Sequence, residues 1–99
     1  MYGTVAHMRI KPGMDDALKA YVEESGGRTI PGSVAVYVYR MDADPQEIYM
    51  AVVFESKESY VANADSPDQD ADYRRMLEFL EGPPDWHDGE IVFAGTNTQ

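Results

Sequence analysis

The chain has 99 residues, which is enough for one domain with a modest core and too few for a catalytic domain with a separate regulatory one. Eight lysines and arginines against eighteen aspartates and glutamates give a net charge of −10, which argues against binding of nucleic acid and docking on anionic lipid. The absence of cysteine excludes disulfides, zinc–thiolate sites, iron–sulfur clusters and thiol nucleophiles.

The chain shows no sign of membrane insertion, because no apolar run approaches the ~20 residues of a bilayer span and the N-terminal residues lack a signal-peptide pattern. We therefore expect one cytoplasmic domain over residues 1–99, folded over 1–95 with a short tail over 96–99. Residues 1–41 carry five cations against four acids, whereas residues 42–90 carry three cations against fourteen acids. We interpret the acidic half as a solvated face, with a cation site or a basic partner as the alternative.

The first two elements have clear hydropathy patterns. Residues 2–10 alternate between two faces, which is typical of a strand and places His7 near its middle. After a Pro-Gly break, apolar residues recur every three or four positions from Met14 to Val22. This spacing predicts a helix with one apolar face, ended by Gly26-Gly27.

The middle of the chain predicts a hairpin followed by a broken helix. Two β-branched and aromatic runs, residues 33–41 and 47–55, flank a short polar turn and predict antiparallel strands. Ser56 is a suitable N-cap for the next helix, although Ser59 stands where a capping box would have Glu or Gln. Pro67 interrupts the helical pattern, which then resumes.

A final strand over residues 89–96 completes the order β-α-β-β-α-β. This order predicts a ferredoxin-like α+β fold, with an antiparallel sheet and helices on one of its faces. The strands are apolar on both faces, however, so the face without helices needs a partner. The simplest partner is a second copy, and we expect a homodimer through the open sheet face.

The titratable residues contain no diagnostic site motif. His7 and His87 lack a metal-ligand spacing, so we expect no metal site, and His7 is either a packed strand residue or a general base. The acidic run Asp68–Asp72 begins like a calcium-binding loop. That loop would need Gly and Glu where this chain has Tyr73 and Phe79, so we interpret the run as a helix start.

Aromatic residues are the most informative feature, with seven tyrosines, three phenylalanines and one tryptophan. One interpretation is core or interface packing. The other is a pocket between helices and sheet, with tyrosine hydroxyls, His7 and Asn63 as its few polar groups. Such a pocket suits a planar, hydrophobic and oxidisable ligand.

Four short stretches carry a family resemblance. They are the strand leading into Arg9–Gly13, the Pro31-Gly32 step, the strand–helix junction Val53–Tyr60 and the Ser66-Pro67 step. Together they resemble the antibiotic biosynthesis monooxygenase family, and they span almost the whole chain. The resemblance implies a dimeric α+β barrel.

The resemblance also implies a function. Some members of this family oxidise aromatic polyketides with dioxygen and no cofactor, some bind and degrade haem, and many have no known substrate. Many members carry a histidine where this chain has Asn63. Haem is disfavoured, because the haem-degrading members place a histidine near the position of Tyr73. The implied activity is therefore a cofactor-independent monooxygenase that acts on a small aromatic or polycyclic hydrophobic substrate.

Within that hypothesis, His7 is the expected base, Asn63 and Tyr37 are hydrogen-bond donors to the substrate anion, and Trp86 is a wall. Further substrate-binding aromatics are expected at Tyr39, Tyr49 and Tyr73. The alternative is a non-catalytic dimeric barrel that binds a small hydrophobic metabolite, or a structural dimer without activity. A cavity lined by His7, Asn63 and Tyr37 would favour the enzyme, and a filled core would favour the alternative.

Overall fold

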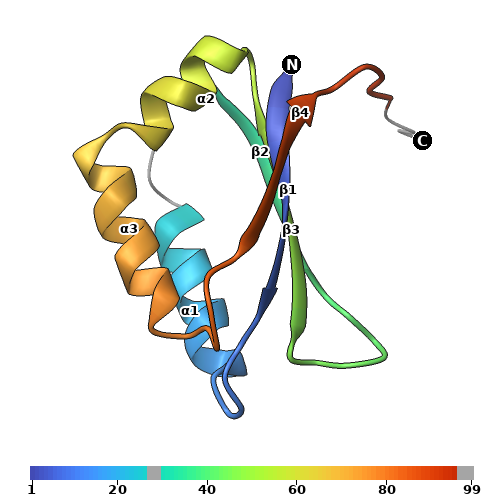
Figure 1. Ribbon diagram of the computed structural model, residues 1–99, viewed down its shortest axis with the longest axis vertical. Helices are drawn as coiled ribbons and strands as arrows, with labels where there is room; N and C mark the ends of the chain where they lie inside the picture. The colour runs from blue at the N-terminus through green and yellow to red at the C-terminus, as the bar shows by residue number, and fades with distance from the viewer. Residues whose placement is uncertain (27–29, 96–99) are drawn as a thin grey trace.

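The computed structural model describes residues 1–26 and 30–95, so the expected tail over 96–99 and the stop signal at Gly27 lie outside the described residues. One four-stranded antiparallel sheet has the order β2-β3-β1-β4, and all helices lie on one side of it (Figure 1). This confirms the ferredoxin-like α+β fold. The elements are β1 (Tyr2–Arg9), α1 (Asp15–Gly26), β2 (Ser33–Arg40), β3 (Glu47–Phe54), α2 (Lys57–Ala64), α3 (Pro67–Leu77) and β4 (Asp85–Glu90).

The strand register decides which side chains face the helices. Ala6 of β1 is fully buried on the helical side, and it pairs with Met50 of β3 and Trp86 of β4. Because successive strand residues point to opposite faces, His7 lies on the side without helices. It pairs there with Tyr49 of β3.

Serine caps position the two helices that follow the hairpin. At the start of α2, Ser59 N donates to Ser56 Oγ at 3.1 Å, and Ser56 N donates to Ser59 Oγ at 3.3 Å. Ser59 thus completes the capping box in the role that Glu or Gln usually takes. At the start of α3, Ser66 accepts from Gln69 N, and two residues of the acidic run occupy the first turn. This confirms that the acidic run begins a helix.

The core occupies the region around the end of β1. Ile10 is 1% exposed, and its bridge to Leu80 ties the chain after α3 to the chain after β1. Backbone hydrogen bonds from Lys11 N to Phe79 O and from Glu81 N to Arg9 O, both 2.8 Å, flank this bridge. The buried cluster consists of Ala6, Met8, Ile10, Leu18, Tyr21, Ile48 and Leu80.

The last strand lies earlier in the chain than the apolar run Ile91–Phe93 indicates. It was expected over residues 89–96, but β4 spans Asp85–Glu90, so Trp86 lies within a strand and not in the preceding loop. The reason is the register with β1, since Glu90 pairs with Tyr2 and Ile91 N donates to Met1 O. The pairing of β4 with β1 thus ends at Glu90, before the apolar residues.

The sheet face opposite the helices is apolar and uncovered within this chain. Its exposed residues include Val5, Tyr37, Tyr39 and Tyr49. Val92 and Phe93, which are 89% and 85% exposed, follow β4 where the chain leaves the sheet (Figure 1). No helix in the described part of the chain is long and apolar enough to cross a membrane.

Candidate ligand-binding cavity

A cavity of about 800 Å³ lies between the sheet and the helical layer. This volume is within the range of pockets that bind small molecules, about 300–1,000 Å³. The sheet contributes mainly apolar side chains, because the inward positions of β2 and β3 are apolar. These sheet residues are Val36, Val38, Met50, Val52 and Phe54. The cavity therefore suits a ligand with a large apolar surface.

Two aromatic rings from different elements border the cavity. Trp86 comes from an inward position of β4, and Tyr73 comes from α3. Their ring centroids are 6.2 Å apart, with an angle of 47° between the ring planes. Such rings present flat apolar surfaces against which an aromatic ligand can pack.

Asn63 supplies an amide to the same cavity. It lies on α2, and its Nδ2 donates to Gln69 Oε1 at 3.2 Å. This contact fixes the orientation of the amide and uses one of its two N–H groups. The other N–H group of Nδ2 and the side-chain oxygen Oδ1 make no hydrogen bond within the described part of the chain. The side-chain amide can therefore bind a ligand.

Tyr60 and Asp88 form a polar pair at the wall of the cavity. The Tyr60 hydroxyl donates to Asp88 Oδ1 at 2.8 Å, and edge-to-face contacts with Tyr2 and Phe54 hold its ring. Burial and then the hydrogen bond to the Asp88 carboxylate raise the pKa of Tyr60 to about 12. The nearby Thr4 hydroxyl acts in the opposite direction and lowers the pKa of Tyr60. Tyr60 is thus a neutral phenol whose proton is committed to Asp88.

Thr4 adds a hydroxyl without a partner to this part of the wall. It pairs with Asp88 in the register of β1 and β4, and it is 5% exposed. Its Oγ1 atom is buried and makes no hydrogen bond to any residue that the structure describes. Buried hydroxyls usually have a partner, so this atom marks an unsatisfied polar position beside the cavity.

The structure divides the site residues expected from the sequence between the two faces of the sheet. Asn63, Tyr73 and Trp86 line the cavity. The other four lie on the face without helices, and the sheet separates them from Asn63 because strand neighbours alternate in direction. The expected pocket that combines His7, Asn63 and Tyr37 is therefore not formed within one chain. The residues on the open face are His7, Tyr37, Tyr39 and Tyr49.

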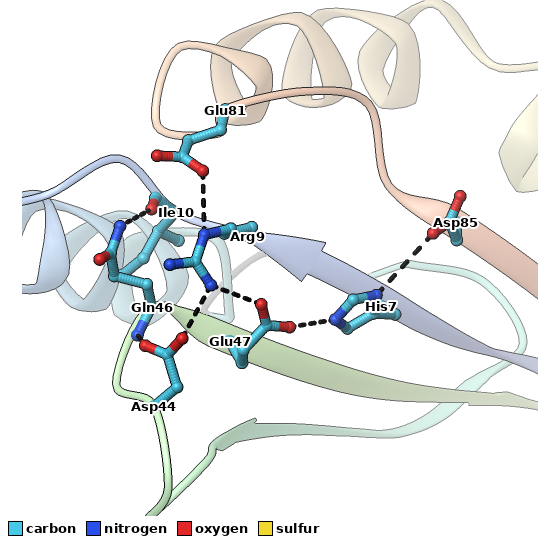
Figure 2. A network of polar contacts seen from close by, with 8 residues as sticks. All are labelled: His7, Arg9, Ile10, Asp44, Gln46, Glu47, Glu81 and Asp85. Carbon is cyan, nitrogen blue, oxygen red and sulfur yellow. Dashed lines mark hydrogen bonds and ion pairs between the residues drawn. The ribbon is translucent and has the colours of Figure 1, made fainter.

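His7 belongs to an ionic network on that open face (Figure 2). Its Nε2 contacts the Glu47 carboxylate, and its Nδ1 lies 3.8 Å from Asp85 Oδ2. The hydrogen bond to Glu47 is the main cause that raises the pKa of His7 above its usual 6.5, and the charge of Asp85 contributes. A histidine held in this way favours its protonated form. The geometry therefore favours a structural role for His7 over that of a general base.

Arg9 extends the network to the loops at the same end of the sheet. Its Nη1 donates to Asp44 Oδ2 at 2.8 Å and to Glu47 Oε1 at 2.5 Å, and its Nε lies 3.0 Å from Glu81 Oε2 (Figure 2). The bond to Arg9 keeps the pKa of Asp44 below its ordinary value, and the bonds to His7 and then to Arg9 do the same for Glu47. Arg9 thereby links β1, β3 and the segment after α3.

Sequence reasoning missed Thr4, Tyr60 and Asp88 as a group. The sequence pattern places the last strand over residues 89–96, which leaves Asp88 outside it, so the alternation of Asp88 with Trp86 gives no signal. Once β4 is placed at Asp85–Glu90, the inward positions 86 and 88 follow from strand alternation. Among the described residues, no three histidine, aspartate or glutamate side chains converge to hold a metal ion.

The fold and the cavity define a small antiparallel α+β protein with an aromatic-lined cavity between sheet and helices. The sequence profile of the family named antibiotic biosynthesis monooxygenase matches residues 1–73. The chain therefore belongs to the antibiotic biosynthesis monooxygenase family. No curated protein sequence matches it.

Solved structures have the same fold. A protein of Chloroflexus aurantiacus J-10-fl with the same family name has 27% sequence identity and a TM-score of 0.78, over 96% of each chain. Rv0793 from Mycobacterium tuberculosis has 15% identity and a TM-score of 0.77, over 96% of this chain and 98% of its own. A Deinococcus radiodurans protein with the family name has 9% identity and a TM-score of 0.80, over the full length of both chains. At these low identities, the last two similarities show the fold alone.

Proposed function

We propose that this protein is a cofactor-independent monooxygenase that binds a small aromatic or polycyclic hydrophobic substrate in the cavity between sheet and helices. The observation that carries the proposal is the cavity itself. It has about 800 Å³, and it brings together Asn63, Tyr73 and Trp86 in a member of this monooxygenase family. A filled core at this place would have left no room for a substrate.

The residues of the cavity have defined tasks in this reaction. The substrate packs against Tyr73 and Trp86, which exclude water from one side of its ring. The substrate loses a proton to water, and the free N–H group of Asn63 donates to a substrate oxygen and stabilises the anion that forms. One oxygen atom of dioxygen then enters the substrate. The other leaves as water, with the required electrons and protons supplied by the substrate ring.

Oxygen consumption tests this proposal. The purified chain is mixed with hydroquinones and anthrones, and uptake of dioxygen is measured for the wild type, Asn63→Ala and His7→Ala. Loss of the Asn63 donor is expected to lower the rate by about 10², as for other donors to a developing oxyanion. His7→Ala is expected to leave the rate within about twofold, because the sheet separates His7 from the cavity. A large loss in His7→Ala with no loss in Asn63→Ala would refute this use of the cavity.

A second candidate function is binding without catalysis. The observation that favours it is the absence of histidine from the described part of the cavity wall, since the carboxylates that line it, Asp70, Asp72 and Asp88, are weaker bases than histidine. This candidate predicts that the same aromatic molecules bind to the cavity and that dioxygen uptake stays at the uncatalysed rate. The oxygen assay therefore separates the two candidates.

We also propose that two copies associate through the open sheet face. The support is an exposed apolar surface on a sheet whose other face is covered by helices. Tyr37, Tyr39 and Val5 are each more than half exposed in the single chain. A twofold partner that faces this sheet would bury all three residues from both copies.

A further inference from the structure

Among the described residues, the charged side chains that line the cavity all have the same sign. They are Asp70, Asp72 and Asp88, and no lysine, arginine or histidine lines the cavity in the part of the chain that the structure describes. Asp70 lies 3.1 Å from the guanidinium of Arg74 on the same helix, so its charge is partly compensated. Asp88 is different, because its contact in residues 1–26 and 30–95 is the neutral Tyr60 hydroxyl.

Asp88 stands next to two further oxygen acceptors. The Tyr60 hydroxyl gives its proton to Asp88, which leaves the lone pairs of its oxygen for another donor. The Thr4 hydroxyl is buried and unpartnered, and Thr4 is the cross-strand neighbour of Asp88. Three oxygen atoms with acceptor capacity thus lie at one wall of a cavity that is otherwise mainly apolar.

We propose that the cavity is specific for an aromatic amine, whose ammonium group is bound by Asp88, Tyr60 and Thr4 while its ring packs against Tyr73 and Trp86. An ammonium group has three N–H donors and a positive charge. These match three oxygen acceptors, one of which is a carboxylate without a basic partner among the described residues. The inference rests on the proposed function in one respect, which is that the cavity is the substrate site.

The same charges disfavour other ligand classes. A carboxylate or phosphate group would meet Asp88 and its acidic neighbours without a basic side chain from the described residues to pair with. The net charge of −10 adds a long-range attraction for cations and a repulsion of anions. An ammonium group on the substrate would also offset the negative charge that develops on the ring when it loses a proton.

A set of three ligands with the same ring tests the inference. These are para-phenylbenzylamine, para-phenylbenzyl alcohol and para-phenylbenzoic acid, which at neutral pH are cationic, neutral and anionic. Trp86 is the single tryptophan of the chain and lines the cavity, so its fluorescence reports binding there. We expect the amine to bind about tenfold more tightly than the alcohol, and the acid to bind more weakly than both.

Asp88→Asn is the decisive variant, because asparagine keeps an acceptor for the Tyr60 hydroxyl and removes the charge. We expect it to abolish the preference for the amine and to leave the affinity for the alcohol within about twofold. Asp42→Asn is the matched control, since it removes the same charge from the loop between β2 and β3, away from the cavity. It should retain the preference. If Asp88→Asn does not fold, the affinities of the wild type are measured at increasing salt concentration instead. Of the three affinities, only that for the amine should weaken as salt is added.

The outcomes separate this inference from the proposed function. Equal binding of the three ligands, or tighter binding of the acid, would overturn the inference and leave the cavity as a substrate site. An unchanged amine preference in Asp88→Asn would also overturn it. If none of the three ligands changes the fluorescence of Trp86, the cavity does not bind aromatic molecules, and both proposals fall.

Discussion

The open sheet face allows a quantitative prediction for Tyr37→Ala. Tyr37 is 59% exposed in the single chain, and an aromatic side chain of its size presents about 200 Å² when fully accessible. It therefore offers about 120 Å² to a partner. At ~25 cal/mol per Å², its burial is worth about 3 kcal/mol per copy, or about 6 kcal/mol for the two copies of a symmetric dimer. Part of this value is lost to ordering of the interface, so we expect Tyr37→Ala to weaken the dimer by about 10²–10⁴ in dissociation constant.

Sedimentation velocity over a range of concentrations measures this effect. The wild type is expected to sediment at about twice the chain mass of 11.1 kDa at micromolar concentration, and Tyr37→Ala to shift toward the single chain. Val61→Ala is the control, because Val61 is 43% exposed on α2, on the helical side of the sheet. A wild type that stays monomeric at micromolar concentration would refute the reasoning, and so would equal effects of the two variants.

Three further predictions concern stability, each measured by urea unfolding. Ile10→Ala should lower the free energy of unfolding by about 2–5 kcal/mol, because Ile10 is 1% exposed in the core, and a loss below about 1 kcal/mol would contradict the core assignment. Ser56→Ala removes the acceptor of Ser59 N and should cost about 1 kcal/mol, whereas no loss would show that the capping box is not formed in solution. The raised pKa of His7 means that its bond to Glu47 stabilises the fold fully below the unfolded pKa of 6.5 and loses this effect as pH rises through the higher folded pKa. The stability difference between the wild type and His7→Gln should therefore shrink from acidic to alkaline pH, and a difference that grows would refute the assigned direction.

Much of the fold follows from local patterns in the sequence. These patterns act within a few residues, so they predict the elements in the right order. They are strand alternation, the helical spacing before Gly26 and the cap at Ser56. The last strand is the exception. Its position is set by the register with β1, in which Tyr2 pairs with Glu90, and not by the more apolar residues that follow. A pairing between the two ends of the chain has no local signal.

The candidate site was harder to predict for a related reason. Strand alternation correctly placed Tyr37 and Tyr39 on one face, but it does not show which face the helices cover. The pairing of Tyr39 with Tyr49 and of Tyr49 with His7 puts these three residues on one face, and the burial of Ala6 shows that the helices cover the other face. Asn63 was identified because the family resemblance points to its position on α2.

The central claim is that the cavity between sheet and helices oxygenates an aromatic molecule. Its most direct test is the reaction of the purified chain with isotopically labelled dioxygen and an aromatic substrate that changes the fluorescence of Trp86. We expect one labelled oxygen atom in each product molecule, and loss of this product in Ala64→Trp, which fills the cavity from α2. A product that takes its oxygen from water, or full activity in the filled variant, would contradict it.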